Sequence, residues 1–213
     1  TLKNNITNLE IIIVDDNSND GTQEKIKKLN INNEFKVIFR KKSVGLASAF
    51  LRGIIETTGD YIGWLDTNMA ELSPKFKEMK NFLSSGNDIV ILSRYINGGG
   101  DKRNILRFIT SKYFNLFCSL VFRQPIKDYT TSIFLMKRHV INEVSFLGYG
   151  HGEFFIEFLY NAYKKGFKIL EIPFVQKKDD ILGVSKSAPN LFKFFYHAIM
   201  YFLRVLITLI RRN

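Results

Sequence analysis

The chain has 213 residues, of which 46% are hydrophobic and 24% are charged. This length and composition predict one domain with a substantial core and exclude a disordered protein. The single cysteine, Cys118, excludes an internal disulfide and a cysteine-rich zinc site. The formal net charge of +11 favours anionic partners, namely nucleic acid, a phospholipid surface or phosphorylated small molecules.

Short apolar runs alternate with longer amphipathic runs in the N-terminal half of the chain. Strands are predicted at 10–15, 35–39, 61–65 and 88–92, and helices at 22–29, 46–56 and 74–83. The run at 10–15 is rich in β-branched residues, as is typical of a strand buried on both faces. Ser73 and Pro74 are the expected N-cap and first residue of the third helix. The alternation predicts a mainly parallel α/β sheet flanked by helices, in which ligands bind beyond the carboxyl ends of the strands.

The C-terminal half is more apolar and basic. After a Gly-rich loop we expect a helix at 104–122, a strand at 132–136, a helix at 153–164, a strand at 167–172 and one long helix at 187–213. The polar positions of the last helix fall on one face: Lys193, His197, Arg204, Thr208 and Arg211. The opposite face is broadly apolar, and the helix at 104–122 repeats this pattern.

An apolar face with a basic stripe predicts helices that lie in a membrane interface. A spanning helix would place Arg204 near the middle of the membrane, at a cost of about 2.5–3.5 kcal/mol. A core helix of a soluble protein is the alternative interpretation. Nucleic acid does not explain the charge, because the aromatic residues cluster on the apolar helices and no nucleic-acid-binding motif is present.

Two predicted strands end in acidic or amide side chains. Asp15 and Asp16 follow the first strand, and Asp66 and Asn68 follow the third. A bare carboxylate at the end of a buried strand is costly unless it meets a donor or a cation. In extended backbone Asp66 and Asn68 point to the same side, which suits a hard divalent cation that also binds a diphosphate. Helix capping by the three aspartates is the alternative interpretation.

Six segments in order resemble inverting glycosyltransferases of the GT-A fold, in particular the dolichyl-phosphate mannosyltransferase and polyprenyl-phosphate glycosyltransferase branch of glycosyltransferase family two. Residues 13–22 match its V-D-D-x-S-x-D-G-T segment. The other matching segments are 45–53 (G-L-x-x-A-x-x-x-G), 58–62 (with G-D-Y-I), 93–99 (S-R-Y with G-G), 128–132 (resembling D-x-x-S-G) and 183–186 (G-x-S-K).

The resemblance implies a role for each matching residue. Asp15 and Asp16 would face the nucleotide base and ribose. Asp66, with Asn68, would hold Mg²⁺ or Mn²⁺ on the diphosphate. The usual motif there is D-x-D, and the change to asparagine removes one negative charge from the metal site.

Other roles implied by the resemblance concern the leaving group and the acceptor. Arg94 would contact phosphate, and Ser185 and Lys186 would close over the leaving group. Asp128 and Glu157 would line the acceptor end. A surface ion pair for Arg94 and a solvated helix face for Glu157 are the alternative interpretations. His151 and His197 are expected to be structural or solvent-facing.

The family opens with a strand that has no counterpart among the residues preceding Ile11. We therefore expect an N-terminally truncated GT-A catalytic domain at 1–186, followed by an amphipathic membrane-interface helix at 187–213. A sheet without its opening strand would have a gap or an unprotected edge.

The resemblance implies a membrane-associated enzyme at the cytoplasmic face. It would transfer a hexose from GDP-mannose or UDP-glucose to a polyprenyl or dolichyl phosphate, with inversion and a divalent metal. A phosphate acceptor is already anionic and needs no strong general base. The alternatives are transfer to a saccharide, for which Asp128 or Glu157 would be the base, and a non-catalytic membrane-bound nucleotide-sugar binder.

Overall fold

The computed structural model describes residues 8–30, 34–42, 45–178 and 191–211. The main sheet has the strand order β3-β6-β4-β7, with β3 Tyr61–Trp64, β6 Phe134–Lys137, β4 Ile89–Ser93 and β7 Ile169–Pro173. A second sheet pairs β1 (Ile12–Asp15) with β2 (Lys36–Phe39), and a third pairs β5 (Gly100–Asp101) with β8 (Val175–Gln176). The pairs β1–β2, β4–β7 and β5–β8 are parallel, whereas β6 runs antiparallel to β3 and β4.

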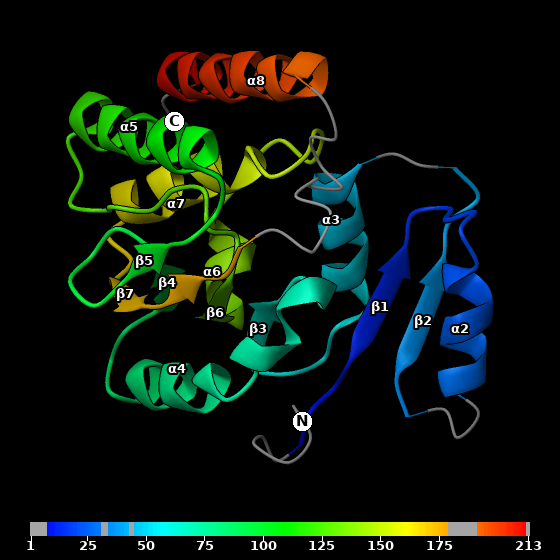
Figure 1. The fold of residues 1–213 in the computed structure, drawn as a ribbon. Helices are drawn as coiled ribbons and strands as arrows, with labels where there is room; N and C mark the ends of the chain where they lie inside the picture. The colour runs from blue at the N-terminus through cyan, green and yellow to red at the C-terminus, as the bar shows by residue number, and fades with distance from the viewer. Residues whose placement is uncertain (1–7, 31–33, 43–44, 179–190, 212–213) are drawn as a thin grey trace.

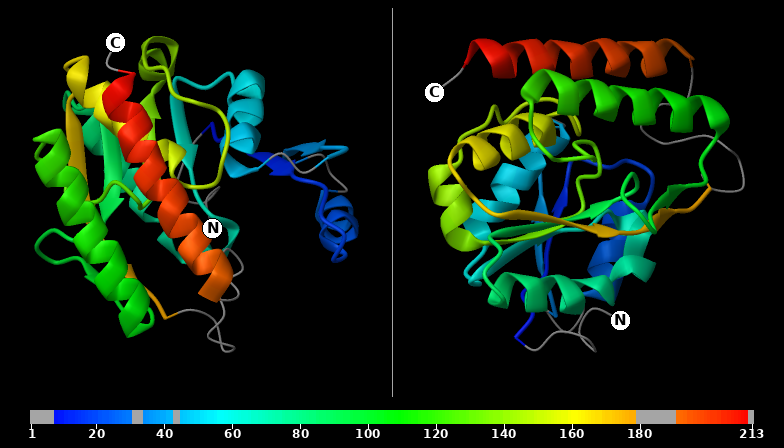
Figure 2. Two further views of the ribbon diagram at one scale, coloured as in Figure 1. Left: turned by 90° about the horizontal axis from the view of Figure 1, so that it is seen from above. Right: turned by 90° about the vertical axis from the view of Figure 1, so that its left-hand side faces the viewer.

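Helices cover both faces of the main sheet (Figure 1). Their bounds are α2 Thr22–Leu29, α3 Leu46–Glu56, η1 Thr67–Leu72 (a 3₁₀ segment), α4 Lys75–Ser84, α5 Ile105–Phe122, α6 Arg138–Glu143, α7 Phe154–Lys164 and α8 Leu191–Ile210. Figure 2 shows α4 on one face, α7 on the other, and α5 with α8 as an outer layer beyond α7. The protein is therefore an α/β fold with helices on both sides of the sheet.

Alternation along β4 explains why the main sheet is buried on both faces. Ile89 and Ile91 pack in the core cluster under α3 and α7, while Val90 and Leu92 pack in the cluster against α4. All four side chains are fully buried. Successive side chains of a strand point to opposite faces, so an uninterrupted apolar run fits a sheet that is covered on both sides.

Among the described residues the predicted helices and strands are present, with differences at their ends; residues 187–190 and 212–213 of the last predicted helix lie outside that part of the structure. Asn104 caps α5, because its side chain accepts the Leu106 N–H at 2.9 Å. Ser73, predicted as the cap of α4, is itself helical and belongs to the turn that ends η1. Its hydroxyl is buried with no hydrogen-bond partner among the described residues. The sequence did not predict η1, α6 or the short strands β5 and β8.

A cavity of about 1620 Å³ lies between β1 and β3. Residues of both strands line it, and in the part of the chain that the structure describes each of these strands pairs on one side only. Residues 11–14 are consequently half-buried, not buried on both faces as predicted. The expected gap in the sheet is thus present, and the cavity extends from it to the carboxyl ends of both strands.

The polar face of α8 points into the protein, and its apolar face points outward. Arg204 and Thr208 are buried, whereas Phe195, Ile199 and Leu206 are more than half exposed. The sequence predicted the two faces of this helix but not that the basic stripe would face the domain. The inward orientation has an electrostatic cause, because Arg204 of α8 and Arg211 directly after it both pair with buried Glu157 of α7.

Candidate active site

Two acidic residues, each of which follows a strand of a different sheet, line the same cavity. Asp16 comes directly after β1, and Asp66 comes two residues after the end of β3. The Asp16 carboxylate pairs with Arg40, with Nε 3.1 Å from Oδ1, and accepts the Gly45 N–H at 2.9 Å. Gly45 has a φ of 104° and immediately precedes α3, so the start of α3 holds Asp16 in place.

Asp66 projects from the turn between β3 and η1. One of its oxygens, Oδ1, accepts the Trp64 Nε1–H at 3.0 Å. Its carboxylate makes no capping bond to the described backbone of η1, so the capping interpretation does not account for it. The side chain therefore remains available at the cavity wall for a cation or a ligand.

Asp15 has a different environment from Asp16. Its carboxylate is buried and accepts hydrogen bonds from the Ser18 N–H at 3.0 Å and from the Gln23 side chain at 2.7 Å. These bonds hold the turn that leads into α2. Asp15 does not line the cavity. Of the two residues expected to face the nucleotide, the structure brings only Asp16 to the cavity with Asp66.

The donor atoms at this wall fit a divalent cation that has few protein ligands. Among the described residues no group of three or more His, Cys, Asp or Glu side chains gathers into a metal cage. A hard cation takes oxygen ligands and shares its remaining positions with a diphosphate, so a single carboxylate at Asp66 suffices as an anchor. The side chain of Asn68 lies outside the described part of the structure, as do Ser185 and Lys186.

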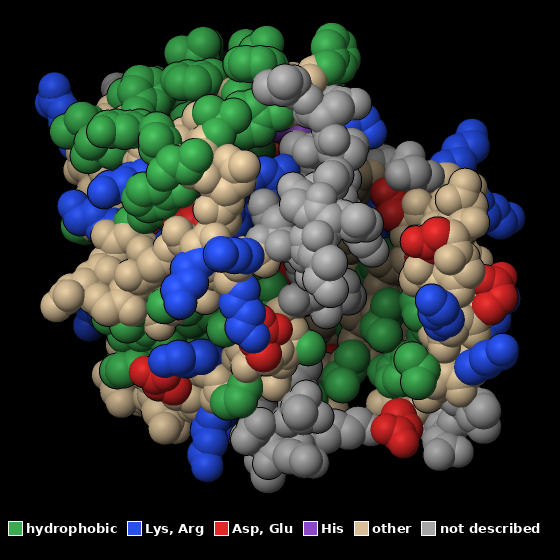
Figure 3. Space-filling view, viewed as in Figure 1, with side chains coloured by type: hydrophobic (Ala, Val, Ile, Leu, Met, Phe, Trp, Pro, Cys, Tyr) green, Lys and Arg blue, Asp and Glu red, His purple; other side chains and the backbone are tan. Residues whose placement is uncertain are grey.

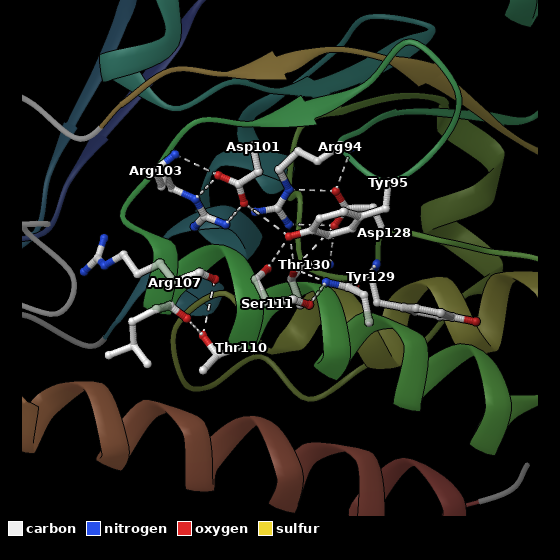
Figure 4. Close-up of polar contacts among 12 residues, drawn as sticks. Arg94, Tyr95, Asp101, Arg103, Arg107, Thr110, Ser111, Asp128, Tyr129 and Thr130 are labelled. Carbon is white, nitrogen blue, oxygen red and sulfur yellow. Dashed lines mark hydrogen bonds and ion pairs between the residues drawn. The ribbon is translucent and has the colours of Figure 1, made fainter.

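Arg94 and Asp128 form a buried ion pair (Figure 4). The Arg94 Nε and Nη2 groups donate to the two Asp128 oxygens at 2.8 and 2.7 Å. Nη2 also donates to the Thr130 hydroxyl at 2.7 Å. Burial disfavours the charge of Arg94, but Asp128 raises the pKa of the guanidinium above its usual value. Neither residue lines the cavity. The roles expected for them, phosphate contact and acceptor lining, do not match this pairing.

A second arginine–aspartate ion pair lies beside the first, just before α5. The Arg103 Nε group donates to Asp101 Oδ1 at 2.8 Å, and the Arg94 Nη1 group lies 3.8 Å from Asp101 Oδ2. Burial raises the pKa of Asp101, but the bonds from Arg103 outweigh it and hold this pKa below its usual value. With Arg107 in the first turn of α5, arginines outnumber carboxylates here (Figure 4). The sequence indicated basic residues at this helix start but assigned them only to membrane contact.

Tyr201 of α8 is influenced electrostatically by both this basic cluster and the cavity acids. Burial, followed by Glu153, raises the pKa of its hydroxyl above the usual range. Arg94 and Arg103 oppose that rise, and Asp66 adds to it. The arginine cluster and the acids of the cavity are thus within electrostatic reach of one tyrosine side chain.

Glu157 does not reach the cavity. It is buried on α7, where Arg204 Nη1 and Arg211 Nη1 lie 2.8 and 2.7 Å from its two oxygens. The Leu147 N–H also donates to it at 3.1 Å. Its expected role at the acceptor end does not match this environment, because a buried carboxylate needs charged partners, and here these are Arg204 of α8 and Arg211 directly after it.

Two histidines lie at the wall near Asp66. His151 and His197 line the cavity with their ring centroids 5.3 Å apart, and Glu153 lies beside them. Burial, and then His197, lower the pKa of His151. The sequence treated both as structural or solvent-facing, since no motif marks them. Their position depends on α8 folding back over the cavity.

The fold is that of GT-A nucleotide-diphospho-sugar transferases. It matches glucosyl-3-phosphoglycerate synthase from Mycobacterium tuberculosis in complex with phosphoglyceric acid, with a TM-score of 0.69 and 13% identity over 92% of this chain and 67% of that one. The complex of that enzyme with Mn²⁺, UDP and glucosyl-3-phosphoglycerate matches with a TM-score of 0.67 and 14% identity, over 93% of this chain and 68% of that one. At these identities the likeness shows the fold.

Residues 1–145 match Glycosyl transferase family 2, and the chain belongs to that family. It is 31% identical over 170 residues to a dolichol-phosphate mannosyltransferase of Pyrococcus furiosus, covering 78% of this chain and 47% of that protein. It is 26% identical over 192 residues to a polyprenol monophosphomannose synthase of Mycolicibacterium smegmatis, covering 84% of this chain and 71% of that protein. The chain therefore spans about half the length of the first relative.

Proposed function

We propose that this chain is the catalytic domain of a membrane-associated glycosyltransferase that transfers a hexose from a nucleotide diphosphate sugar to a polyprenyl phosphate. One observation carries the proposal: Asp16 and Asp66, from different sheets, share one cavity at the strand ends. In α/β proteins, ligands bind beyond the carboxyl ends of the strands. Asp16 would face the nucleoside and Asp66 the diphosphate. The names of the two relatives support the lipid acceptor.

We place a divalent cation, Mg²⁺ or Mn²⁺, at Asp66. Bound there, it would neutralise the charge that develops on the departing nucleotide diphosphate. Asp66 is prepared for this role, because Trp64 fixes one of its oxygens and so orients the carboxylate. The donor sugars that we propose are GDP-mannose and UDP-glucose, with inversion at the anomeric carbon.

A phosphate acceptor fits this site better than a saccharide hydroxyl. A hydroxyl acceptor needs a carboxylate base. Both carboxylates considered for that role, Asp128 and Glu157, are buried in ion pairs with arginines. A phosphate is already ionised, and the basic cluster at the start of α5, with Arg103 and Arg107, suits its charge. These contacts favour the polyprenyl phosphate.

The outer faces of α5 and α8 form an extended apolar surface. We call it the α5–α8 apolar surface, and Figure 3 shows hydrophobic side chains gathered over these two helices. Its exposed members are Ile105, Leu106, Ile109, Tyr113, Leu116, Phe117, Leu120, Phe192, Phe195, Tyr196, Ile199, Phe202, Leu203, Leu206 and Ile210. An exposed apolar patch of this extent marks a protein or membrane contact.

We propose that this surface lies on the membrane. Residues 105–122 and 192–210 are long and apolar enough to span a bilayer. However, the inner face of α8 carries the buried Arg204 and Thr208, and Asn115 is buried on α5. Helices held to the domain by polar inner faces fit an orientation flat on the membrane, as interfacial helices have. The acceptor lipid would then enter beside the arginine cluster at the start of α5, from the cytoplasmic leaflet.

Incubating the protein with radiolabelled GDP-mannose or UDP-glucose, Mn²⁺ or Mg²⁺, and vesicles that contain polyprenyl phosphate tests the proposal. We expect label in the lipid fraction, and loss of transfer in Asp66→Ala and Asp16→Ala. Glu24→Gln, an exposed acid on α2, is the matched control and should transfer normally. Label appearing only in added saccharide would overturn the lipid acceptor. Nucleotide binding without any transfer would support a non-catalytic binder.

A further inference from the structure

Arg204 connects the outer helix α8 to a loop of the catalytic domain. Although it lies on a helix whose other face is apolar and exposed, its side chain is buried. The guanidinium donates to Glu157 at 2.8 Å, to the Leu147 carbonyl at 3.3 Å and to the Tyr149 carbonyl at 2.7 Å. It also lies over the Tyr149 ring, 4.6 Å from its centroid. One side chain therefore holds the backbone of this loop at two carbonyl groups.

The loop held by Arg204, residues 147–151, forms part of the cavity wall. Gly150 and His151 line the cavity, and the Gly150 carbonyl accepts the Ala47 N–H at 3.2 Å. Gly148 packs so closely on α3 that an added Cβ would lie 2.1 Å from the Leu51 side chain. The loop thus rests on α3 on one side and on Arg204 on the other.

Direct contacts lead from this loop to the acid at the donor site. The Gly150 carbonyl oxygen bonds to Ala47 in the first turn of α3, and Gly45, two residues earlier, donates its N–H to Asp16. An added Cβ on Gly45 would lie 2.9 Å from that same Gly150 oxygen. Moving the loop would therefore move or release the start of α3, which holds the Asp16 carboxylate.

We propose that Arg204 is a positioning residue that links the seating of α8 on the membrane to the geometry of the nucleotide-sugar site. This inference rests on the proposed function. The outward face of α8 contacts the lipid, and the inward face, through Arg204, fixes the loop that supports Asp16. A membrane that holds α8 against the domain then favours the loop position that binds the donor. Membrane binding of α8 and donor binding at the site then favour each other by the same coupling free energy.

The chemistry requires arginine at this position. A planar guanidinium has enough donors to serve three acceptors and can also stack on an aromatic face. Lysine offers only a single point charge. Arg211 provides a matched control. It pairs with the same Glu157, is partly exposed, and has no contact with the loop carbonyls among the described hydrogen bonds. Replacing Arg211 by lysine perturbs its pairing with Glu157 without removing a bond to the loop carbonyls.

The first measurement is hydrogen exchange of the full chain, which does not depend on any ligand. In Arg204→Lys we expect the amides of Leu147 and His151 to exchange on the order of tenfold faster, because losing a charged hydrogen bond weakens local protection by about that factor. Arg211→Lys should leave them unchanged. The double variant Glu157→Gln with Arg204→Met removes both charges of the pair. It leaves neither of these charges buried without its partner, so it is the variant to measure if Arg204→Lys does not fold. Unchanged loop exchange in Arg204→Lys would overturn the proposal.

The second measurement is binding of GDP and UDP with Mn²⁺, with and without phosphatidylcholine–phosphatidylglycerol vesicles. In the wild type we expect tighter binding with vesicles. In Arg204→Lys we expect about tenfold weaker binding and no effect of vesicles, while Arg211→Lys keeps both. A vesicle effect that persists in Arg204→Lys would also overturn the coupling. Binding of neither nucleotide to the wild type would instead contradict the proposed function, and the exchange result would still decide the role of Arg204 in the loop.

Discussion

Arg94 and Asp128 form a two-point ion pair in which both side chains are almost fully buried. The pair joins the end of β4 to the segment that precedes β6, and the Arg94 backbone N–H also donates to Asp128 at 3.0 Å. Each charge compensates the other where both side chains are buried. The contacts are therefore those of a structural ion pair, and neither residue lines the cavity.

Breaking this pair should destabilise the protein strongly. Asp128→Asn leaves the Arg94 charge buried without its partner, for which we expect a loss of about 3–5 kcal/mol in the free energy of unfolding. Urea denaturation followed by circular dichroism measures it. The control is Glu78→Gln, which removes the exposed pair with Lys75 and should cost less than about 1 kcal/mol. Equal effects of the two substitutions would contradict the assignment of Arg94 and Asp128 as a structural pair.

Neighbouring aspartates after β1 should respond differently to the same substitution. Asp15→Asn weakens the bonds from Ser18 and Gln23, so we expect a loss of about 1–3 kcal/mol in stability with nucleotide binding retained. Asp16→Asn should instead reduce nucleotide binding, since its carboxylate lines the cavity. Calorimetric binding of GDP and UDP, beside thermal unfolding, separates the two. If Asp15→Asn abolished binding in a folded protein, the division of roles would be incorrect.

Acidic substitutions on the α5–α8 apolar surface should weaken membrane binding and leave the fold intact. Leu116→Glu and Leu206→Glu change side chains that are about half exposed. Each leucine buried in lipid contributes about 1.5–3 kcal/mol, so each change should weaken vesicle binding by on the order of tenfold or more. Sedimentation with vesicles measures this. Leu29→Glu on α2 is the matched control, because Leu29 is 74% exposed but far from this surface. Unaltered sedimentation of both α5–α8 variants would refute the membrane orientation.

Stability should fall in mild acid because of His151. Burial, His197 of α8, Glu153 and Asp66 act on its imidazole, with the net result that its pKa is lowered. Above the unfolded pKa of 6.5 both states are neutral, so this stability is fully present. As the pH falls below that value the unfolded chain binds the proton first, and stability is lost until the folded pKa is passed.

His151→Gln should therefore flatten the pH dependence of the unfolding free energy between about pH 7.5 and about pH 5.5. Urea denaturation across that interval provides the comparison. The control is His139→Gln, which removes a half-exposed imidazole that does not line the cavity. An identical slope in wild type and His151→Gln would show that another group is responsible.

The sequence predicted those features whose signals are local. The alternation of strands and helices predicted the sheet, and Asn104 and the apolar periodicity predicted α5 almost to the residue. The positions of Asp16 and Asp66 at the carboxyl ends of two strands predicted that both would line one cavity. The local sequence and the tendency of ligands to bind beyond strand ends suffice for these inferences, although β1 and β3 belong to different sheets.

Long-range pairing was not predictable in the same way. Arg94 and Asp128 are 34 residues apart, and nothing in either segment indicates that they neutralise each other. The periodicity of α8 predicted two faces, but only the buried Glu157 on α7 determines that the arginine stripe faces inward. Antiparallel β6 likewise depends on packing between β3 and β4, for which a single strand carries no local signal.

The separation of β1 and β2 from the main sheet has a dynamic consequence. This two-stranded unit makes no backbone ladder with the other strands among the described residues, and α2 beside it has no buried side chain. It should therefore open at a lower free energy than β4, which is paired on both edges. Asp16 lies at the end of β1, so a bound nucleotide would contact both this unit and the main sheet and would stabilise the closed state. Protease resistance near α2 would therefore rise with ligand concentration.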